Sequence, residues 1–244
     1  MGVLILQGLT IPFVLPALAA VVGALAVAYL LGTFPTADLV AGAAGKDLSA
    51  EGSGNPGASN AFRVAGKRAG AKVLIGDLLK GALAAGFGIG IGGLLDPEGA
   101  GPRILGYSCT LAAVLGHCYP LLRLKRGGRG VASAAGGLIV LEPLFMAIAF
   151  SCWALVARVS RRASLASLGM AIGIPAGLVV LRRPPVELAF VFAMALIVVI
   201  RHIPNITRLR RGEERALPLP PVKGATPPEL YGRGQRSNPA HDDR

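Results

Sequence analysis

The chain has 244 residues, of which 53% are hydrophobic and only 16% are charged, and its mean hydropathy is +0.60. This balance excludes an ordinary water-soluble domain, because such domains carry about 25% charged residues. The formal net charge of +12 would also suit a protein that binds nucleic acid. A basic inner face is typical of membrane proteins, however, so we expect membrane lipids and no nucleic acid as partners.

Seven apolar stretches predict seven transmembrane helices, since a helix needs roughly 20 apolar residues to cross a bilayer. In chain order they are residues 14–32, 70–95, 103–122, 130–141, 144–157, 164–181 and 185–201. The fourth and fifth are short, because Glu142 and Pro143 divide one apolar run, and six helices is the alternative count. The first 31 residues contain no basic residue ahead of the apolar run, which argues against a removable signal peptide.

Basic residues in the loops favour seven helices over six and set the orientation. On the seven-helix interpretation, the loops on one side hold most of the cations: Lys46, Arg63, Lys67, Arg68, Arg123, Lys125, Arg126, Arg129, Arg158, Arg161 and Arg162. The other side holds only Arg103, Arg182 and Arg183. Because cytoplasmic loops carry the excess of Lys and Arg, the sequence predicts an all-α polytopic membrane protein with its N-terminus outside and its C-terminus in the cytoplasm.

Composition changes near the C-terminus, where residues 212–244 are rich in Pro, Gly and charge. Such a segment cannot bury much apolar surface, so we expect a disordered cytoplasmic tail after a transmembrane domain of residues 1–211. The three cysteines, Cys109, Cys118 and Cys152, are scattered singly. They predict neither a disulfide framework nor a metal site, and no cofactor is expected.

Three polar constellations interrupt the apolar sequence, and the first is GSGNPGASN, from Gly52 to Asn60. It stands just before a stretch with helical character. Small residues there could present backbone N–H groups and polar side chains to an anion near a helix N-terminus. The candidates are Gly52, Ser53, Gly54, Asn55 and Asn60, with Arg63 one turn farther on. A flexible loop is the alternative interpretation.

The second constellation is RGGRG, residues 126–130, directly before the fourth apolar stretch. Gly127, Gly128 and Gly130 would allow the backbone to approach a phosphate closely, while Arg129 offers a bidentate fork. A simple cytoplasmic anchor is the alternative. The third constellation is RHIPNI, residues 201–206, in which His202 and Asn205 share one face if the helix continues. A structural histidine is the alternative there.

The predicted topology brings all three constellations to the cytoplasmic side, although they are far apart in sequence. A membrane-surface site with many donors, several cations and few carboxylates is suited to a ligand that carries more than one phosphate. Asp77 and Lys80, one turn apart near the start of the second stretch, are expected to neutralise each other within the bundle.

At these residues the chain resembles the bacterial acyl-phosphate:glycerol-3-phosphate acyltransferases, the PlsY family. The resemblance rests on GSGNPGASN followed by Arg63, on DLLKG (residues 77–81), on GHCYP running toward GGRGVA (residues 116–132) and on RHIPNI. These motifs stand in the family's order and cover roughly residues 22–211. The resemblance implies an enzyme of the bacterial inner membrane, active on its cytoplasmic side in phospholipid biosynthesis. It would transfer a fatty acyl group from acyl phosphate to the sn-1 hydroxyl of glycerol 3-phosphate, giving lysophosphatidic acid and phosphate.

The same resemblance implies roles for individual residues. Ser53, Arg63, His202 and Asn205 match site residues of the family, and the three glycines of the second constellation shape its turn. Arg129 departs from the family's usual lysine, which keeps the charge but changes the geometry of the donors. Ser164 and Ser167 resemble a serine pair of the family, and His117 of the GHCYP motif is a further substrate-binding candidate.

Direct attack by the glycerol hydroxyl is the expected mechanism, because acyl phosphate is already activated and needs mainly positioning and charge stabilisation. Ser53, Arg129 and His202 are the candidates for the catalytic centre. His202 could act as a base, but a role as phosphate ligand is slightly preferred. An acyltransferase with an H-x-x-x-x-D motif is disfavoured, since Leu122 and Thr207 stand five residues after His117 and His202. A transporter of an anionic small molecule is the main alternative.

Overall fold

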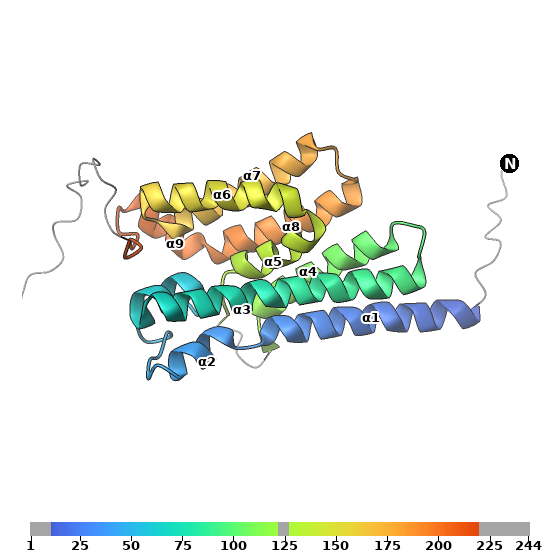
Figure 1. Ribbon diagram of the computed structural model, residues 1–244, viewed down its shortest axis with the longest axis horizontal. Helices are drawn as coiled ribbons and strands as arrows, with labels where there is room; N and C mark the ends of the chain where they lie inside the picture. Colours follow the sequence, from blue (N-terminus) through green and yellow to red (C-terminus); the bar gives the residue numbers. More distant parts are fainter. Residues whose placement is uncertain (1–10, 122–126, 220–244) are drawn as a thin grey trace, which may run out of the picture.

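The computed structural model describes residues 11–121 and 127–219, and its regular elements there are all helices. In chain order they are α1 (Ile11–Thr33), α2 (Thr36–Gly42), α3 (Ala58–Leu95), α4 (Gly101–Cys118), α5 (Val131–Leu141), α6 (Pro143–Ser160), α7 (Ala163–Val180), α8 (Pro185–Arg201) and α9 (Ile203–Arg210) (Figure 1). Each of the seven predicted apolar stretches corresponds to a helix, and α2 and α9 are short additional helices. Arg123, Lys125 and Arg126 lie outside the described residues.

Length and composition make some of these helices clear membrane spans. Within the described residues, four segments are long and apolar enough to cross a bilayer: Val14–Gly42, α3, α6 and α7. A fifth is reached if α8 and α9, which meet at an angle of 55°, form one broken span. Helix α5 has only 11 residues, which is roughly half the thickness of a hydrocarbon core. The chain is therefore an integral membrane protein with four or five evident spans.

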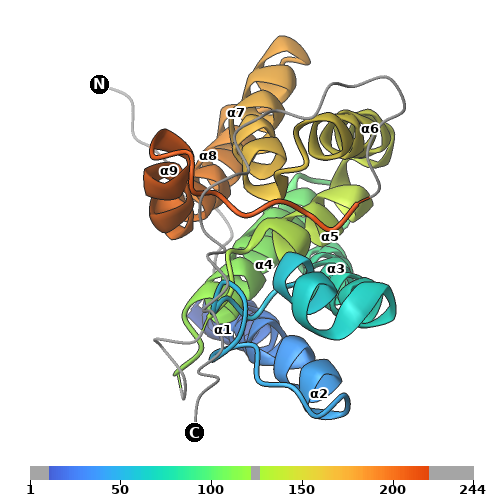
Figure 2. The same cartoon turned by 90° about the vertical axis from the view of Figure 1, so that its left-hand side faces the viewer.

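The helices form two groups that meet along α5 (Figures 1 and 2). Helices α1, α3 and α4 pack together on one side, and α6, α7 and α8 pack on the other, while α5 contacts α3, α4 and α6. One end of this bundle, which we call the motif end, contains the starts of α3, α5 and α7 and the ends of α4, α6 and α8. It brings together the three constellations that the sequence singled out.

Small residues allow the helices around α3 to approach closely. A side chain at Gly81 or Gly136 would collide with the backbone of α5 or α3, and one at Gly32 would collide with the backbone of α4. Helices in a bilayer gain little from hydrophobic burial against each other, so close contact between small residues supplies much of their association. The glycine content of this chain therefore has a packing role as well as a role in the loops.

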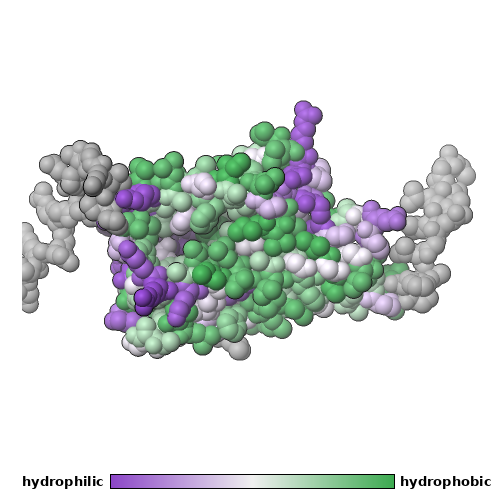
Figure 3. All heavy atoms as spheres, viewed as in Figure 1, coloured by the Kyte–Doolittle hydropathy of each residue, from purple (hydrophilic) through white to green (hydrophobic). Residues whose placement is uncertain are grey.

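Large apolar side chains lie exposed around the flank of the bundle, where Figure 3 shows a broad hydrophobic surface with hydrophilic residues gathered toward its ends. More than half exposed among them are residues from several helices, including Leu18, Leu30, Leu83, Leu144, Leu155, Ile172 and Leu196. An apolar surface of this extent is what a protein presents to lipid rather than to water.

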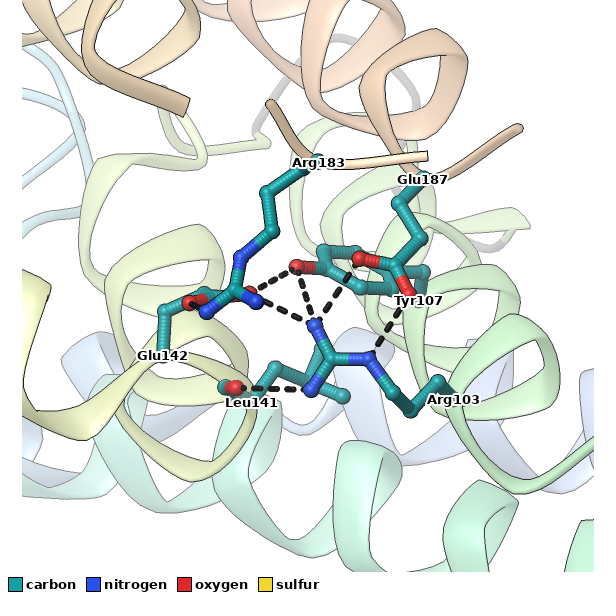
Figure 4. Close-up of polar contacts among 6 residues, drawn as sticks. All are labelled: Arg103, Tyr107, Leu141, Glu142, Arg183 and Glu187. Atoms are coloured by element: carbon teal, nitrogen blue, oxygen red, sulfur yellow. Dashed lines mark hydrogen bonds and ion pairs between the residues drawn. The ribbon is translucent and has the colours of Figure 1, made fainter. Parts of the chain in front are cut away.

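A buried ion-pair network fixes the break between α5 and α6. Glu142 caps both helices there and accepts hydrogen bonds from Arg103 of α4, Arg183 of the α7–α8 turn and Tyr107 (Figure 4). Arg103 also pairs with Glu187 at 2.7 Å, which connects the network to α8. Two buried carboxylates thus face two arginines, so that neither negative charge is left unpaired inside the protein.

The chain beyond α9 differs from the expectation of a tail that is disordered from residue 212. Residues 212–219 run along the motif end of the bundle, and both Glu214 and Leu217 are buried there, at 6% exposure each. Hydrogen bonds to Arg63, Arg161 and Ser164 hold this stretch in place. The rest of the predicted tail, residues 220–244, lies outside the described residues.

Candidate active site

The loop before α3 is folded around Asn60 rather than left open. The side-chain oxygen of Asn60 accepts the backbone N–H of Ser53 at 2.7 Å, and its amide nitrogen donates to the carbonyls of Leu48 and Glu51 at 3.1 Å. Gly52 has φ of +64° and lies against Asn60, where a side chain would collide. Asn60, predicted to bind substrate, therefore uses both side-chain atoms to shape the loop that carries Ser53.

The Ser53 side chain is available to bind a ligand. Its hydroxyl is buried and has no hydrogen-bond partner among the described residues. An orphaned buried hydroxyl is costly unless something else satisfies it. Asn55, from the same loop, lines the large cavity described below, and Gly54 turns the loop with φ of +69°.

Arg63 lies in the first turns of α3, ahead of a kink at Gly66, whose φ of +86° is outside the helical region. Its guanidinium donates to the backbone carbonyls of Ala216 at 3.0 Å and Arg215 at 3.1 Å. This predicted anion-binding side chain is thus engaged with the segment that follows α9. Its positive charge still acts at the motif end, where it helps to lower the pKa of Arg129.

The glycine turn before α5 is built by close approaches of its backbone. Gly127 lies against the carbonyl of Cys118, and Gly128 lies against the imidazole of His117, so a side chain at either position would collide. Gly130, with φ of +80°, is the N-cap of α5. The N–H of Gly128 donates to the carbonyl of His117 at 3.0 Å. His117 therefore supports the turn from beneath.

Arg201, at the end of α8, holds the other side of this turn. Its guanidinium donates to the carbonyls of Gly127 and Gly128, and it stacks over the ring of Tyr119 at 5.3 Å from the ring centroid. Arg201 was not among the predicted site residues, although it is the first residue of the RHIPNI motif. Only His202 and Asn205 of that motif were predicted to take part in the site.

Arg129 presents the free cation of the site. Its side chain lines the large cavity, and no residue in the described part of the chain offers its guanidinium a hydrogen bond or an ion pair. Burial lowers the pKa of Arg129 to about 10, with Glu214 opposing this shift and Arg208, Arg63 and Arg201 adding to it. The group is still protonated at neutral pH and is suited to an anion that is absent from the protein itself.

His202 lies at the junction of α8 and α9 and is 2% exposed. Its Nδ1 is 2.7 Å from the carbonyl oxygen of Val198, and since a carbonyl only accepts hydrogen bonds, Nδ1 carries a proton. In the neutral ring, Nε2 is then an acceptor. His202 also lines the large cavity, close to Arg129 in space as the sequence predicted.

Glu214 gathers three side chains on one carboxylate. Its Oε1 accepts hydrogen bonds from Asn205 at 2.7 Å and from Ser164 at 2.8 Å, and its Oε2 pairs with Arg208 at 2.9 Å. Burial by itself would raise the pKa of Glu214, but these hydrogen bonds outweigh it and hold the pKa below its usual value. Sequence reasoning missed Glu214 because it placed the residue in the tail; the only signal was an acidic pair directly after a basic helix.

The second serine of the predicted pair lies apart from this cluster. Ser167 accepts a hydrogen bond from the indole N–H of Trp153 at 3.2 Å and also lines the cavity. Asn205 is held by Glu214 through its amide nitrogen, while its buried side-chain oxygen has no partner among the described residues. That oxygen is a second orphaned polar atom at the motif end.

A cavity of about 410 Å³ opens among the site residues, although Ser53, Arg63, Asn205 and Glu214 are not part of its lining. Its polar lining includes three cations, two imidazoles and two hydroxyls: Arg129, Lys67, Arg158, His202, His117, Ser164 and Ser167. The remaining wall is mostly apolar and comes from α3, α5, α6 and α7: Leu74, Leu78, Val131, Ala135, Phe150, Trp153 and Met170. A cavity with cationic and hydroxyl groups at one part and apolar side chains elsewhere suits a molecule with an anionic head and a hydrocarbon chain.

Behind the glycine turn is a second, much smaller cavity of about 30 Å³, lined by Asp77, Lys80, His117, Gly127 and Gly128 among others. Asp77 and Lys80 form a buried ion pair at 2.7 Å, which confirms the expected mutual neutralisation. The Lys80 ammonium also lies 3.4 Å from Nδ1 of His117. This buried set supports the back of the turn. Within the described residues, no cluster of three potential metal ligands is present.

The fold and the site together are those of an integral membrane enzyme with a cavity of mixed polar and apolar lining. The model of the glycerol-3-phosphate acyltransferase family matches residues 22–212. The glycerol-3-phosphate acyltransferase of Syntrophotalea carbinolica is 39% identical, over 77% of this chain and 92% of that protein. The Rubrobacter xylanophilus protein of the same name is 38% identical, over 77% and 90%.

Solved structures agree with this assignment. The crystal structure of PlsY, an integral membrane glycerol 3-phosphate acyltransferase, in its glycerol 3-phosphate form has a TM-score of 0.71 at 33% identity. Its lysophosphatidic acid form has a TM-score of 0.67 at 31% identity, and each match covers 82% of this chain and 95% of the PlsY chain. The chain belongs to the glycerol-3-phosphate acyltransferase family, as its motifs predicted.

Proposed function

We propose that the protein transfers a fatty acyl group from acyl phosphate to the sn-1 hydroxyl of glycerol 3-phosphate, giving lysophosphatidic acid and phosphate. The observation that carries the proposal is the cavity, which joins the unpaired cation of Arg129 to a wall of apolar side chains. The names of the relatives support the acceptor and the product, since PlsY has been solved with glycerol 3-phosphate and with lysophosphatidic acid.

The reaction needs no covalent intermediate on the enzyme. The sn-1 oxygen attacks the acyl carbon and forms the ester bond, while the bond from that carbon to the phosphate oxygen breaks and its electron pair leaves with phosphate. The hydroxyl proton goes to a nearby base or to the departing phosphate. Because the donor is already activated, the enzyme contributes mainly by positioning both substrates and by stabilising negative charge.

The free donors at the motif end are suited to two phosphates. Arg129 offers an unpaired cation, and Ser53 offers a hydroxyl with no partner in the described protein. His202 meets the substrates through Nε2, because Nδ1 is bound to the carbonyl of Val198. A protonated ring donates from Nε2 to phosphate, and a neutral ring accepts from the attacking hydroxyl.

We further propose that the seven apolar stretches form the transmembrane bundle in the inner membrane, with the short α5 embedded in it rather than spanning it alone, and that the motif end faces the cytoplasm. The distribution of basic residues supports this orientation, with Lys46, Lys67, Arg68 and Arg158 near the motif end. A cytoplasmic site would receive glycerol 3-phosphate from water, while the acyl donor would be available from the bilayer.

The direct test is turnover by the purified protein in detergent. With acyl phosphate and labelled glycerol 3-phosphate, we expect lysophosphatidic acid and one phosphate released for each acyl group transferred, unchanged by EDTA. Acyl-CoA in place of acyl phosphate should give no product. Efficient turnover with acyl-CoA, after rigorous removal of acyl phosphate, would overturn the assignment of the donor.

A further inference from the structure

The five residues after Glu214, Arg215–Leu219, form a strap across the motif end of the bundle. Figure 2 shows the chain leaving α9 and crossing toward the turn between α6 and α7. Glu214 anchors its start through Ser164, Asn205 and Arg208. The strap thus begins at the polar part of the cavity and continues along its apolar part.

Two arginines from distant elements fix the backbone of the strap. The N–H of Leu217 donates to the carbonyl of Arg161 at 2.6 Å, and the Arg161 guanidinium donates back to the carbonyl of Leu219 at 2.7 Å. Arg63 holds the carbonyls of Ala216 and Arg215. Charged donors make strong hydrogen bonds, so this arrangement defines the path of the strap independently of its side chains.

The leucines of the strap form part of the cavity wall. The N–H of Leu219 donates to the carbonyl of Leu217 at 2.8 Å, which makes a tight turn around Pro218. Leu217 packs into a cluster with Ala157, Ala163 and Ala166, whose small side chains leave room for it. Both leucines line the large cavity together with Phe62 and Trp153.

A wall at this place has a chemical consequence. An acyl phosphate held by cations is activated toward any oxygen nucleophile, and water is far more abundant than glycerol 3-phosphate. If water attacks the acyl carbon, the carbon–oxygen bond to phosphate breaks, and the products are a fatty acid, phosphate and a proton. Excluding water from the site is therefore necessary for productive transfer.

We propose that the strap is the water-side wall of the donor cavity and that Leu217 is a positioning residue that shields the acyl phosphate from hydrolysis. The inference rests on the proposed function, because it requires acyl phosphate to occupy this cavity. Leu217 carries it best, since it is buried at 6% exposure, lines the cavity and is fixed by a backbone hydrogen bond to Arg161.

The test measures how much phosphate is released for each lysophosphatidic acid formed. The wild-type ratio should be close to one. In Leu217→Ala the ratio should rise by roughly threefold or more, because water gains access to the activated carbonyl, while the KM for glycerol 3-phosphate stays unchanged. Leu217→Met conserves volume and should restore the wild-type ratio. Phosphate release measured without glycerol 3-phosphate should likewise be faster in Leu217→Ala than in the wild type or in Leu217→Met.

Controls separate shielding from general loss of stability. Leu178→Ala removes a leucine of α7 that is buried at 1% exposure and does not line the cavity, and its ratio should stay close to one. Ending the chain after Leu219 should also leave the ratio unchanged, whereas ending it after Arg215 should raise it as Leu217→Ala does. A ratio near one in both Leu217→Ala and the shorter truncation overturns the proposal. Failure of the proposed function gives a different result, because the wild-type protein would then form no lysophosphatidic acid from acyl phosphate.

Discussion

The Arg129 side chain lines the cavity, where a ligand could reach it, but it is largely shielded from bulk water. Its guanidinium is largely buried and has no partner in the described protein, so the cost of burying a charge is offset only when an anion binds. The surrounding side chains are mostly committed: Asn60 to its loop, Glu214 to Ser164 and Asn205, and Arg63 to the strap. Arg129 has no such commitment in the described protein and lines the cavity, as Lys67 and Arg158 also do, so it is available to bind substrate.

Replacing Arg129 should therefore affect substrate binding more than folding. In Arg129→Ala we expect kcat/KM for glycerol 3-phosphate to fall roughly ten- to a hundredfold, since a charged hydrogen bond contributes about 1.5–3 kcal/mol. Arg129→Lys keeps the charge and should retain much of the activity. Steady-state kinetics of the purified variants measures both. Equal losses in the two variants would show that the charge of residue 129 is not what the substrate recognises.

Glu214 should make stability depend on pH in the acid range. Its pKa is lower in the folded protein than the usual value of 4.5, so its ionised form contributes stability above that value, and the contribution is lost as pH falls through the lower folded-state pKa. Glu214→Gln should lower the Tm at pH 7. The difference between wild type and variant should shrink as the pH falls below about 4.5. A Tm difference that is constant across this range would contradict the role of the charge.

At the scale of elements, the break between α5 and α6 explains how an 11-residue helix fits in the bundle. Helix α5 is too short to span a bilayer alone, and its last turn ends at Glu142, where the chain reverses into α6. A carboxylate at this depth is stable only because Arg103 and Arg183 neutralise it and Tyr107 donates to it (Figure 4). The network thus connects the end of the short helix α5 to α4 and, through Arg103 and Glu187, to α8.

Glu142→Gln should destabilise the protein by about 1.5–3 kcal/mol, because charged hydrogen bonds from Arg103 and Arg183 are lost, while these partly exposed guanidiniums keep contact with water and Arg103 keeps Glu187. Thermal unfolding in detergent should show a large decrease in Tm. The matched control is Glu51→Gln, which breaks the exposed pair of Glu51 with Lys46, where each side chain is 42% exposed, and should change stability by about 0–1 kcal/mol. Similar Tm values for the two variants would argue against a structural role for the network.

The two ends of the molecule differ in role: one end holds the candidate active site, and the other holds the ion-pair network of Arg103 and Glu142. The three motif constellations and the segment from Glu214 to Leu219 converge on the motif end, while the pairs of Arg103 and Glu142 lie toward the other end. The apolar flank between them faces lipid (Figure 3). This polarity predicts that one end faces the cytoplasm and the other faces outward.

Cysteine labelling of intact cells would test the orientation, after the three native cysteines have been replaced. Glu98, in the exposed α3–α4 turn, and Arg68, near the motif end, are both exposed and outside the networks described above. A cysteine at position 98 should react with a membrane-impermeant reagent from outside. One at position 68 should react only after permeabilisation. Equal labelling of the two from outside would refute the predicted topology.

Much of this arrangement could be predicted from the sequence because it depends on local patterns. Apolar runs of sufficient length predicted every long helix, and the divided run at Glu142 correctly marked a break. The spacing of Asp77 and Lys80 predicted their ion pair, because residues one helical turn apart meet on the same face. The ordered motifs indicated the family. Three of the predicted site residues, Arg129, His202 and Ser164, line one cavity in the structure.

Tertiary structure alone decided which of these side chains remain available and what closes the cavity. Asn60 and His117 look like substrate ligands in sequence, yet one holds its loop and the other supports the glycine turn. Glu214 and Leu217 look like parts of a polar tail, because the contacts that dock them on the bundle, to Ser164 and Arg161, lie some 50 or more residues away. Hydropathy and spacing record only a residue's neighbours along the chain, whereas burial and hydrogen-bond satisfaction depend on contacts that exist only once the helices have packed.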